Sequence, residues 1–452
     1  MAHVIIEDEQ YILSAETRKK IFVLLGIGVL LFVVGLVISM SGGPAEVTEG
    51  HSMIQQEELV ASTAQDHAVA QQAEHSAGHE PAYWVKRLHT TLWMNNVFFI
   101  GLGIIGLFFV AIHYASQAGW SAGFIRIPLT MGNWIPIAGI LTIVLFFITN
   151  HTVFHWTHGY LYQEGPQYDP IIAGKAKFFF WPGEGGGFPL FYIVRMVLFF
   201  GMWYWFYTVI RKNLLAEDLE AKPVYWYKNR SISAWFLVFF AVSSSIAAWD
   251  WVMSIDTHWY STMFGWYIFA SWWVTGLAMI TLICAYLKEA GYLKVVNANH
   301  LHDLAKYIFA FTIFWAYIWF SQFLLIWYAN IPEESVYFIE RLQTSPYSWI
   351  FYANLILNFV LPFLLLMTRD SKRQIAMLKV VCPIVIVGHW FDFYNMVTPG
   401  IMKEQGALGI LEIGVALIFL AAYLLVVLSS LSKIPLVGKN HPTLVESLNH
   451  HI

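Results

Sequence analysis

The sequence predicts an all-α integral membrane protein with ten transmembrane helices, arranged as two four-helix bundles and two peripheral helices. Composition is the first reason: hydrophobic residues make up 58% of the 452-residue chain and charged residues only 12%, about half the charged fraction of an ordinary soluble domain. So few charges cannot cover the surface of a soluble protein of this size. The second reason is that the apolar residues fall into ten runs of about 20 residues, the length that crosses a bilayer as a helix.

The ten apolar runs are separated by more polar segments. In chain order they are Ile21–Met40, Trp93–Tyr114, Trp134–His155, Pro189–Ile210, Ile232–Met253, Trp259–Leu287, Tyr307–Tyr328, Tyr347–Met367, Ala376–Val397 and Leu408–Leu431. The first run is longer than the roughly 7–15 apolar residues of a signal peptide, so we interpret it as a membrane anchor.

The distribution of Lys and Arg predicts the direction of the chain. If the N-terminus is cytoplasmic, 18 of the 25 Lys and Arg residues fall on inner segments or inner helix ends, and six fall on outer segments. Membrane proteins enrich positive charge in their cytoplasmic loops. We therefore expect a cytoplasmic N-terminus at 1–20, an even number of spans and a cytoplasmic C-terminus.

The segment 41–89, which follows the first helix at 21–40, is predicted to be an extracytoplasmic polar loop. It is rich in Glu, Gln and Ala and poor in large apolar residues, which is typical of a mobile or partner-bound surface segment. A metal-binding loop is the alternative, but the spacing of the histidines is loose for that role. These histidines are His51, His67, His75 and His79.

A weak internal repeat organises the remaining spans. Trp249-Asp250-Trp251 in the fifth span resembles Trp390-Phe391-Asp392-Phe393 in the ninth, and both spans run outward. An offset of four spans preserves direction, so the repeat is parallel. It predicts a first bundle at 90–255, a second bundle at 256–400, and a last helix with a cytoplasmic tail at 401–452.

Ionisable side chains inside the apolar runs are the candidate functional residues. A charge in hydrocarbon is costly, so such groups usually face a cavity or a partner. In the first predicted bundle they are His151, Arg195 and Asp250, which lie at similar depth in the outer half of the membrane. These three groups, from neighbouring helices, could form one site. The alternative is that Asp250 is only a structural ion-pair partner of Arg195.

A second polar set follows in the seventh to ninth spans. His389 and Asp392 are three residues apart, so they share one face of a helix. The eighth span adds Asn354 and Asn358. We expect a second polar path formed by Gln322, Tyr328, Glu333, His389, Asp392 and Tyr394.

The sequence offers little that could hold a metal or a cofactor. Cys284 and Cys382 are the only cysteines, too few for an iron–sulfur cluster or a Cys-rich zinc site. A membrane b-haem needs two facing histidines, and His151 or His155 falls in a different predicted bundle from His389. We therefore expect no cofactor bound by this chain itself. The net charge of −4 gives no indication of a nucleic-acid partner.

Three motifs resemble those of a known family. They are Ser-Gln-Phe-Leu-Leu-Ile-Trp-Tyr-Ala-Asn-Ile-Pro-Glu-Glu at 321–334, Gly-His-Trp-Phe-Asp-Phe-Tyr at 388–394, and Ala-Trp-Asp-Trp-Val-Met-Ser-Ile-Asp at 248–256. Together with the ten-span pattern, they make the chain similar to the NrfD/polysulfide-reductase family of membrane subunits. Within that family it resembles the subunits of alternative complex III, a quinol:electron-acceptor oxidoreductase.

The resemblance implies a multi-pass subunit of a bacterial cytoplasmic (inner) membrane that is not catalytic alone. Its partners would be a second NrfD-like membrane subunit, an iron–sulfur subunit and multihaem cytochrome c subunits, which carry the clusters and the haems c. Menaquinone or another quinone would be oxidised at the outer side. The long outer loop and the acidic N-terminus fit the membrane subunit that does not lie beneath the iron–sulfur cluster.

The resemblance also suggests roles for the candidate residues. His151 and Asp250, with Arg195 adjusting the carboxylate, would form a quinone-type site or a proton relay. The set from Gln322 to Tyr394 would be a proton pathway. Two alternatives stay open. One is a structural membrane anchor without chemistry of its own, and the other is a proton- or ion-coupled secondary transporter, for which the prolines Pro362 and Pro383 inside spans are the only sign.

Overall fold

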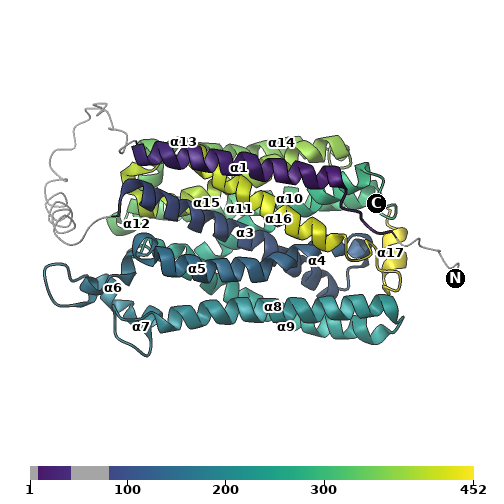
Figure 1. The fold of residues 1–452 in the computed structure, drawn as a ribbon, viewed down its shortest axis with the longest axis horizontal. Helices are drawn as coiled ribbons and strands as arrows, with labels where there is room; N and C mark the ends of the chain where they lie inside the picture. Colours follow the sequence, from purple (N-terminus) through teal and green to yellow (C-terminus); the bar gives the residue numbers. More distant parts are fainter. Residues whose placement is uncertain (1–8, 42–80, 452) are drawn as a thin grey trace.

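The computed structural model describes residues 9–41 and 81–451, and the four histidines of the loop predicted at 41–89 lie outside them. The end of that predicted loop is wrong, because a helix that begins at Tyr83 includes residues 83–89. In the described residues, ten helical segments are long and apolar enough to cross a membrane, and they coincide with the ten predicted runs. The helices run side by side along the long axis of the molecule (Figure 1). The predicted all-α, ten-span fold is confirmed.

Most spans are single long helices, and two spans, the third and the eighth, are built from shorter helices. The long helices are α1 (Ala15–Ser41), α3 (Tyr83–Ala115), α8 (Leu190–Leu219), α9 (Pro223–Trp251), α10 (Phe264–Glu289), α11 (Ala298–Ala329), α15 (Ile375–Met402) and α16 (Ile410–Leu431). The third span joins α4 (Arg126–Met131) to α5 (Ile135–Val153), and the eighth joins α13 (Ser345–Leu355) to α14 (Leu361–Leu365) through a π-helical turn at Ile356–Val360.

Short helices connect the spans. They are α6 (Pro170–Gly174), α7 (Ala176–Phe180), α12 (Pro332–Gln343), α17 (Leu444–Leu448) and the 3-10 turns Gly119–Gly123, Gly132–Trp134, His155–Thr157, Gly159–Tyr162, Met253–Ile255 and Lys403–Gln405. In the described part of the chain, β pairing is limited to an isolated bridge between Gln10 and Pro435.

Several helices extend well past their predicted ends. α8 continues to Leu219 and α9 begins at Pro223, whereas the predicted runs end at 210 and begin at 232. A hydropathy pattern ends where the bilayer ends, but a helix continues into water while its residues remain good helix formers. In the other direction, α5 ends at Val153 because Phe154 adopts an extended backbone, so His155 lies beyond the helix.

The spans form the two predicted bundles. α3, α5, α8 and α9 pack on one another, and α10, α11, α13 and α15 form the second group. α3 and α10 join them and are the most buried spans. Trp272 of α10 donates to the carbonyl of Val97 (3.2 Å), and Trp390 of α15 donates to Asn95 (2.9 Å). The two bundles therefore meet along a packed interface.

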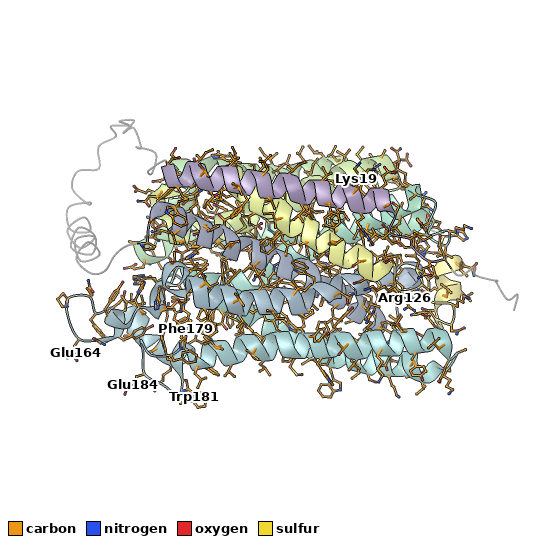
Figure 2. All side chains as sticks on the ribbon, viewed as in Figure 1. Lys19, Arg126, Glu164, Phe179, Trp181 and Glu184 are labelled. Carbon is orange, nitrogen blue, oxygen red and sulfur yellow. The ribbon has the colours of Figure 1, made fainter. Side chains whose placement is uncertain are left out.

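The molecule has two chemically different ends. The β bridge and a hydrogen bond from Leu436 to the carbonyl of Glu9 (2.9 Å) hold the beginning of the described chain against its C-terminal tail. We call this the terminal end, and it carries Lys19 and Arg126, whereas Glu164 and Glu184 lie at the opposite end (Figure 2). Helix α12 also lies at the opposite end (Figure 1).

The peripheral helices α1 and α16 pack closely against each other. Gly28 and Gly35 lie two helical turns apart on one face of α1, and a Cβ atom at Gly35 would lie 2.5 Å from the backbone nitrogen of Leu411. Small residues allow this close approach between membrane helices. Arg87 of α3 holds both carboxylate oxygens of Glu412 at 2.7 Å and so ties α16 to the first bundle.

Replacing Gly35 by Leu is expected to lower the free energy of unfolding by about 1–3 kcal/mol, the usual cost of overpacking, because α1 must move away from α16. Gly26→Leu is the matched control, since a Cβ there meets nothing within 4 Å. Thermal unfolding of the two variants in detergent tests this. Equal melting temperatures would show that the glycine contact is unimportant.

Candidate functional site

Asp392 lies at the centre of the second bundle and is completely buried. One carboxylate oxygen accepts hydrogen bonds from Ser271 (2.6 Å) and Trp315 (2.9 Å). The other accepts from Asn354 (2.7 Å) and from the hydroxyl of Tyr267. In the part of the chain that the structure describes, no Lys or Arg lies within ion-pair distance of this carboxylate. Four neutral donors from three neighbouring helices therefore hold it.

Local sequence explains how the donors reach Asp392. Tyr267 and Ser271 are four residues apart and share one face of α10. Asn354 stands just before the π-helical turn, a feature found often at functional sites. Asn358 donates to the Asn354 side-chain oxygen, so the amide nitrogen of Asn354 faces Asp392. A Cβ at Gly388 would collide with Asn358, so glycine lets α15 approach α13 here.

His389 lies one helical turn from Asp392 and is also completely buried. Its Nδ1 is 3.6 Å from the Asp392 carboxylate, which is too long for a hydrogen bond. Its ring packs edge-to-face against Trp315, with centroids 5.4 Å apart. Neither ring nitrogen has a hydrogen-bond partner among the described residues. A small rotation, or one bridging water, would connect the imidazole to the carboxylate.

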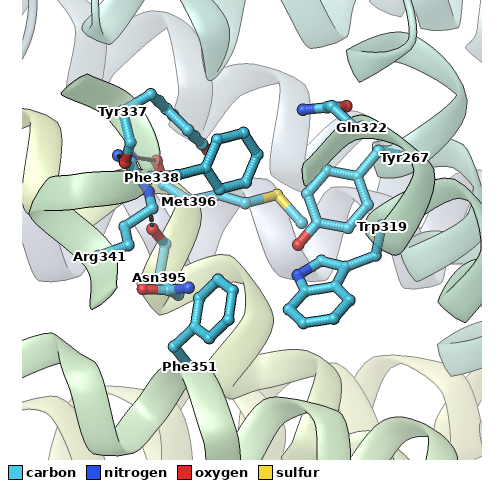
Figure 3. A pocket seen from close by; sticks show the side chains of 9 residues that line it. All are labelled: Tyr267, Trp319, Gln322, Tyr337, Phe338, Arg341, Phe351, Asn395 and Met396. Atoms are coloured by element: carbon cyan, nitrogen blue, oxygen red, sulfur yellow. Dashed lines mark hydrogen bonds between the residues drawn. The ribbon is translucent and has the colours of Figure 1, made fainter. Parts of the chain in front are cut away.

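A narrow pocket lies between this network and the opposite end of the molecule. Its empty volume is about 300 Å³, but it is so narrow that it has room for about one water molecule. Tyr267 lines it and bonds Asp392, so it connects the pocket with the carboxylate. The lining side chains are Tyr267, Trp319, Gln322, Tyr337, Phe338, Arg341, Phe351, Asn395 and Met396 (Figure 3).

Arg341 of α12 closes one side of the pocket. Its guanidinium donates to the backbone carbonyls of Tyr337, Asn395 and Met396 at 2.8–3.1 Å and to the carboxylate of Asp256 at 3.0 Å. These bonds join α12 to the last turns of α15. Figure 3 shows Arg341 and Asn395 on one side of the space and Gln322 and Trp319 on the other.

The acid of the first bundle is in a different environment. Both carboxylate oxygens of Asp250 accept hydrogen bonds from Arg195 at 2.8 Å. The remaining Arg195 nitrogen donates to the carbonyl of Phe178 (2.7 Å), and the guanidinium lies over the rings of Phe178 and Phe191. The pair is buried. Satisfied hydrogen bonds of this kind offset part of the cost of burying two charges.

Corresponding acids in the two bundles therefore have different hydrogen-bond partners. Arg195 lies on the span before Asp250, and Asn354 lies on the span before Asp392. The first acid has a fixed positive partner and the second has a neutral amide. The first acid is thus part of an ion pair, and the second is a carboxylate that neutral donors hold.

The structure does not bring His151 to the Arg195–Asp250 pair. His151 is exposed at the end of α5, where its Nδ1 lies 3.2 Å from the hydroxyl of Thr157. Its ring is next to that of His158, 5.3 Å between centroids. Burial and the neighbouring histidines lower the pKa of His158 to about 4, so it is neutral at pH 7. The predicted three-residue site is therefore divided between an ion pair and a surface histidine cluster.

The second predicted set is brought together only in part. His389 and Asp392 belong to the network, and Gln322 lines the pocket. Tyr394 is buried away from the Asp392 donors, with its ring near that of Tyr347. Two members face outward: Tyr328, with 88% of its surface exposed, and Glu333, in the first turn of α12. The motif at 321–334 thus includes a residue that lines the pocket and residues that lie on the surface.

Tyr267, Ser271 and Trp315 belong to the site but are not among the residues predicted from the sequence. The four-residue spacing of Tyr267 and Ser271 in an apolar helix was an available signal, since two polar groups on one buried face need a common partner.

No family model and no curated protein match the chain.

Proposed function

We propose that this chain is an integral membrane subunit of a quinol-oxidising respiratory complex, most like the ActF subunit of alternative complex III, and that its second bundle carries protons through Asp392. The observation that supports this most is a fully buried carboxylate held by neutral donors alone, beside a buried histidine with no hydrogen-bond partner among the described residues. Intramembrane groups of this kind occur in proton relays.

The proposed step needs only one movement of the His389 ring. When Asp392 is protonated, the proton passes to the neutral imidazole nitrogen that approaches it, leaving a carboxylate and an imidazolium. The hydroxyl of Tyr267 bonds the carboxylate and lines the pocket, so a hydronium ion in the pocket can give its proton to Tyr267 while Tyr267 passes its own proton to Asp392. Quinol oxidation releases two protons with two electrons, so a complex that oxidises quinol needs groups that accept protons near the membrane surface.

The pocket supports a proton pathway better than a quinone site within this chain. A space for about one water does not admit a quinone ring without movement of Trp319, Phe338 or Phe351. We therefore place quinone oxidation at the interface with, or within, the second NrfD-like subunit, the ActC-like partner. The iron–sulfur and multihaem cytochrome c subunits would receive the electrons.

Gentle detergent purification through a tag on this chain, followed by mass spectrometry, tests the proposed assembly. We expect to recover an iron–sulfur protein, multihaem cytochromes c and a second ten-span chain in fixed ratio. A tagged, unrelated ten-span protein from the same membranes is the control. Recovery of this chain alone from intact membranes would contradict the assignment. It would favour the secondary transporter, for which the structural indication is the π-helical turn that interrupts the eighth span.

A structural anchor is the second candidate function, favoured by the Arg195–Asp250 and Arg87–Glu412 pairs. Both are bidentate ion pairs that link helices. In an anchor, substitution of the buried acids would reduce assembly. In a relay, substitution of Asp392 would reduce turnover while the complex stays assembled.

A further inference from the structure

Five polar side chains gather at the terminal end of the first bundle, away from the Asp392 network. Each has at least one nitrogen or oxygen that is buried and makes no hydrogen bond to the described residues. Native proteins rarely leave buried polar atoms unpaired, so this group calls for a further partner. Its members are Tyr114 near the end of α3, Arg126 at the start of α4, Glu217 near the end of α8, Asn229 in the second turn of α9, and His441 in the tail before α17.

Tyr114 lies at the centre of this group. Its hydroxyl is within electrostatic range of Glu217 and Arg126 and next to the amide of Asn229, yet it makes no hydrogen bond of normal length and angle to the described residues. The ring of Tyr114 lies 5.6 Å from that of His441. Three helices, the start of a fourth and the C-terminal tail therefore bring their unpaired polar atoms to one place.

Glu217 is not held by an ion pair with Arg126. The Nη2 of Arg126 donates to Asp218 (2.6 Å) and to the carbonyl of Leu214 (3.2 Å), whereas its Nε and Nη1 are buried without a partner in the described chain. Glu217 has 2% of its surface exposed, and its Oε1 has no partner there either. The titratable groups near Glu217 are Arg126, Asp218 and Tyr114. Donor nitrogens and an acceptor oxygen thus lie close together without bonding each other.

His441 lies between this group and the solvent. The backbone N–H of Thr443 donates to its Nδ1 (3.4 Å), so in the neutral ring Nε2 carries the hydrogen. Burial and the nearby Arg126 lower the pKa of His441 to about 4, which keeps the ring neutral at pH 7. The residue is partly exposed, but its Nε2 is buried and has no partner among the described residues. Gly438 packs beside it, since a Cβ there would lie 3.0 Å from the Nη2 of Arg126.

We propose that bound water joins Arg126, His441 and Glu217, and that Glu217 exchanges a proton through this water with the solvent at the terminal end. One water molecule accepts from Arg126 and from the Nε2 of His441 and donates to the Oε1 of Glu217, which gives it the about three hydrogen bonds usual for buried water. In the exchange, a hydronium ion gives its proton to the carboxylate and becomes water, and the reverse step releases the proton. This site is separate from the Asp392 pathway, so either can fail without the other.

Radiolytic hydroxyl labelling of the full chain in detergent, read by mass spectrometry, tests for the water. Radicals that form from bound water modify the side chains next to it, so we expect Tyr114 to be labelled several-fold faster than Tyr423. Tyr423 is the matched control because it is similarly buried and its hydroxyl has no partner in the described chain, but its neighbours are the rings of Phe99 and Trp134. Equal labelling of the two tyrosines would show that the group is dry and would overturn the proposal.

Infrared difference spectroscopy between acidic and alkaline samples of the same chain tests the proton exchange. We expect a carbonyl component at the frequency of a buried carboxylic acid, lost in Glu217→Gln and kept in Glu289→Gln, which removes an exposed carboxylate. Glutamine keeps the shape of Glu217, so the fold is retained. A difference spectrum in which Glu217→Gln removes no such component would contradict the exchange.

His441→Phe is the second variant, and it keeps the test decisive if Glu217→Gln does not fold. Phenylalanine preserves the ring but removes the Nε2 donor, so the water loses one of its partners. We expect the labelling of Tyr114 in this variant to fall toward that of Tyr423. Unchanged labelling of Tyr114 would show that His441 does not hold the water and would count against the proposed site.

Discussion

Replacing Asp392 by Asn is expected to lower quinol oxidation by the intact complex by about 100-fold, the usual contribution of a positioned acid–base group. Asparagine has the same shape, and its oxygen can still accept from Ser271 and Trp315. Its amide nitrogen takes the place of the oxygen that accepts from Asn354 and Tyr267, so these two donors lose their acceptor while the side-chain volume is kept. Asparagine cannot bind or release a proton. Activity with a soluble quinol and proton release from reconstituted vesicles are the two measurements.

Ser271→Ala is the control for this substitution. It removes one hydrogen bond to the same carboxylate but no titrating group, and we expect a loss of about tenfold or less, in line with the net contribution of about 0.5–1.5 kcal/mol from a typical hydrogen bond. Full turnover and proton release by an assembled Asp392→Asn complex would rule out the relay. Loss of assembly instead of turnover would favour the anchor.

Replacing Arg195 by Gln is expected to have the largest effect on stability, a loss of about 3–5 kcal/mol. Asp250 would remain buried with one neutral partner instead of a bidentate guanidinium, and Phe178 and Phe191 would lose the cation between them. The measured quantities are the amount of folded protein in membranes and the melting temperature in detergent.

The double variant R195M/D250L separates charge burial from packing. Because apolar residues of similar volume often replace a buried ion pair without loss of stability, most of the folded protein should return. A double variant as unstable as Arg195→Gln would show that the pair is needed for its geometry. A stable double variant without turnover would show that the first bundle takes part in the chemistry.

The number, order and bundling of the spans were predictable because membrane insertion selects long apolar runs whatever packs against them. The ends of α8 and α9 at the terminal end of the molecule were not predictable, since polar residues such as Lys212 and Arg230 continue these helices beyond the apolar runs. The repeat around Asp250 and Asp392 located both acids on corresponding helices. It did not show that one has Arg195 beside it and the other Asn354.

The candidate site was predictable where its residues are neighbours on one helix and less so where they meet through packing. His389 and Asp392 share a face of α15, so the sequence indicates the pair. Tyr328 and Glu333 belong to the most distinctive motif but face outward, because a motif specifies residues and not the direction of each side chain. The donors on α10 and α11 are separated from Asp392 by 77 to 125 positions, and no local pattern connects them.

The pairing of α1 with α16 has a consequence for biosynthesis. Of the ten spans, α1 is synthesised before the other nine, and it finds its main partner only when α16 has been inserted. Until α16 is inserted, α1 is surrounded mainly by lipid. Its composition is suited to lipid, because it is the most hydrophobic span, with a mean hydropathy of 3.2, and little of it is buried in the folded protein. In a chain cut short before α16, the face of α1 that carries Gly28 and Gly35 would therefore lack the helix that covers it.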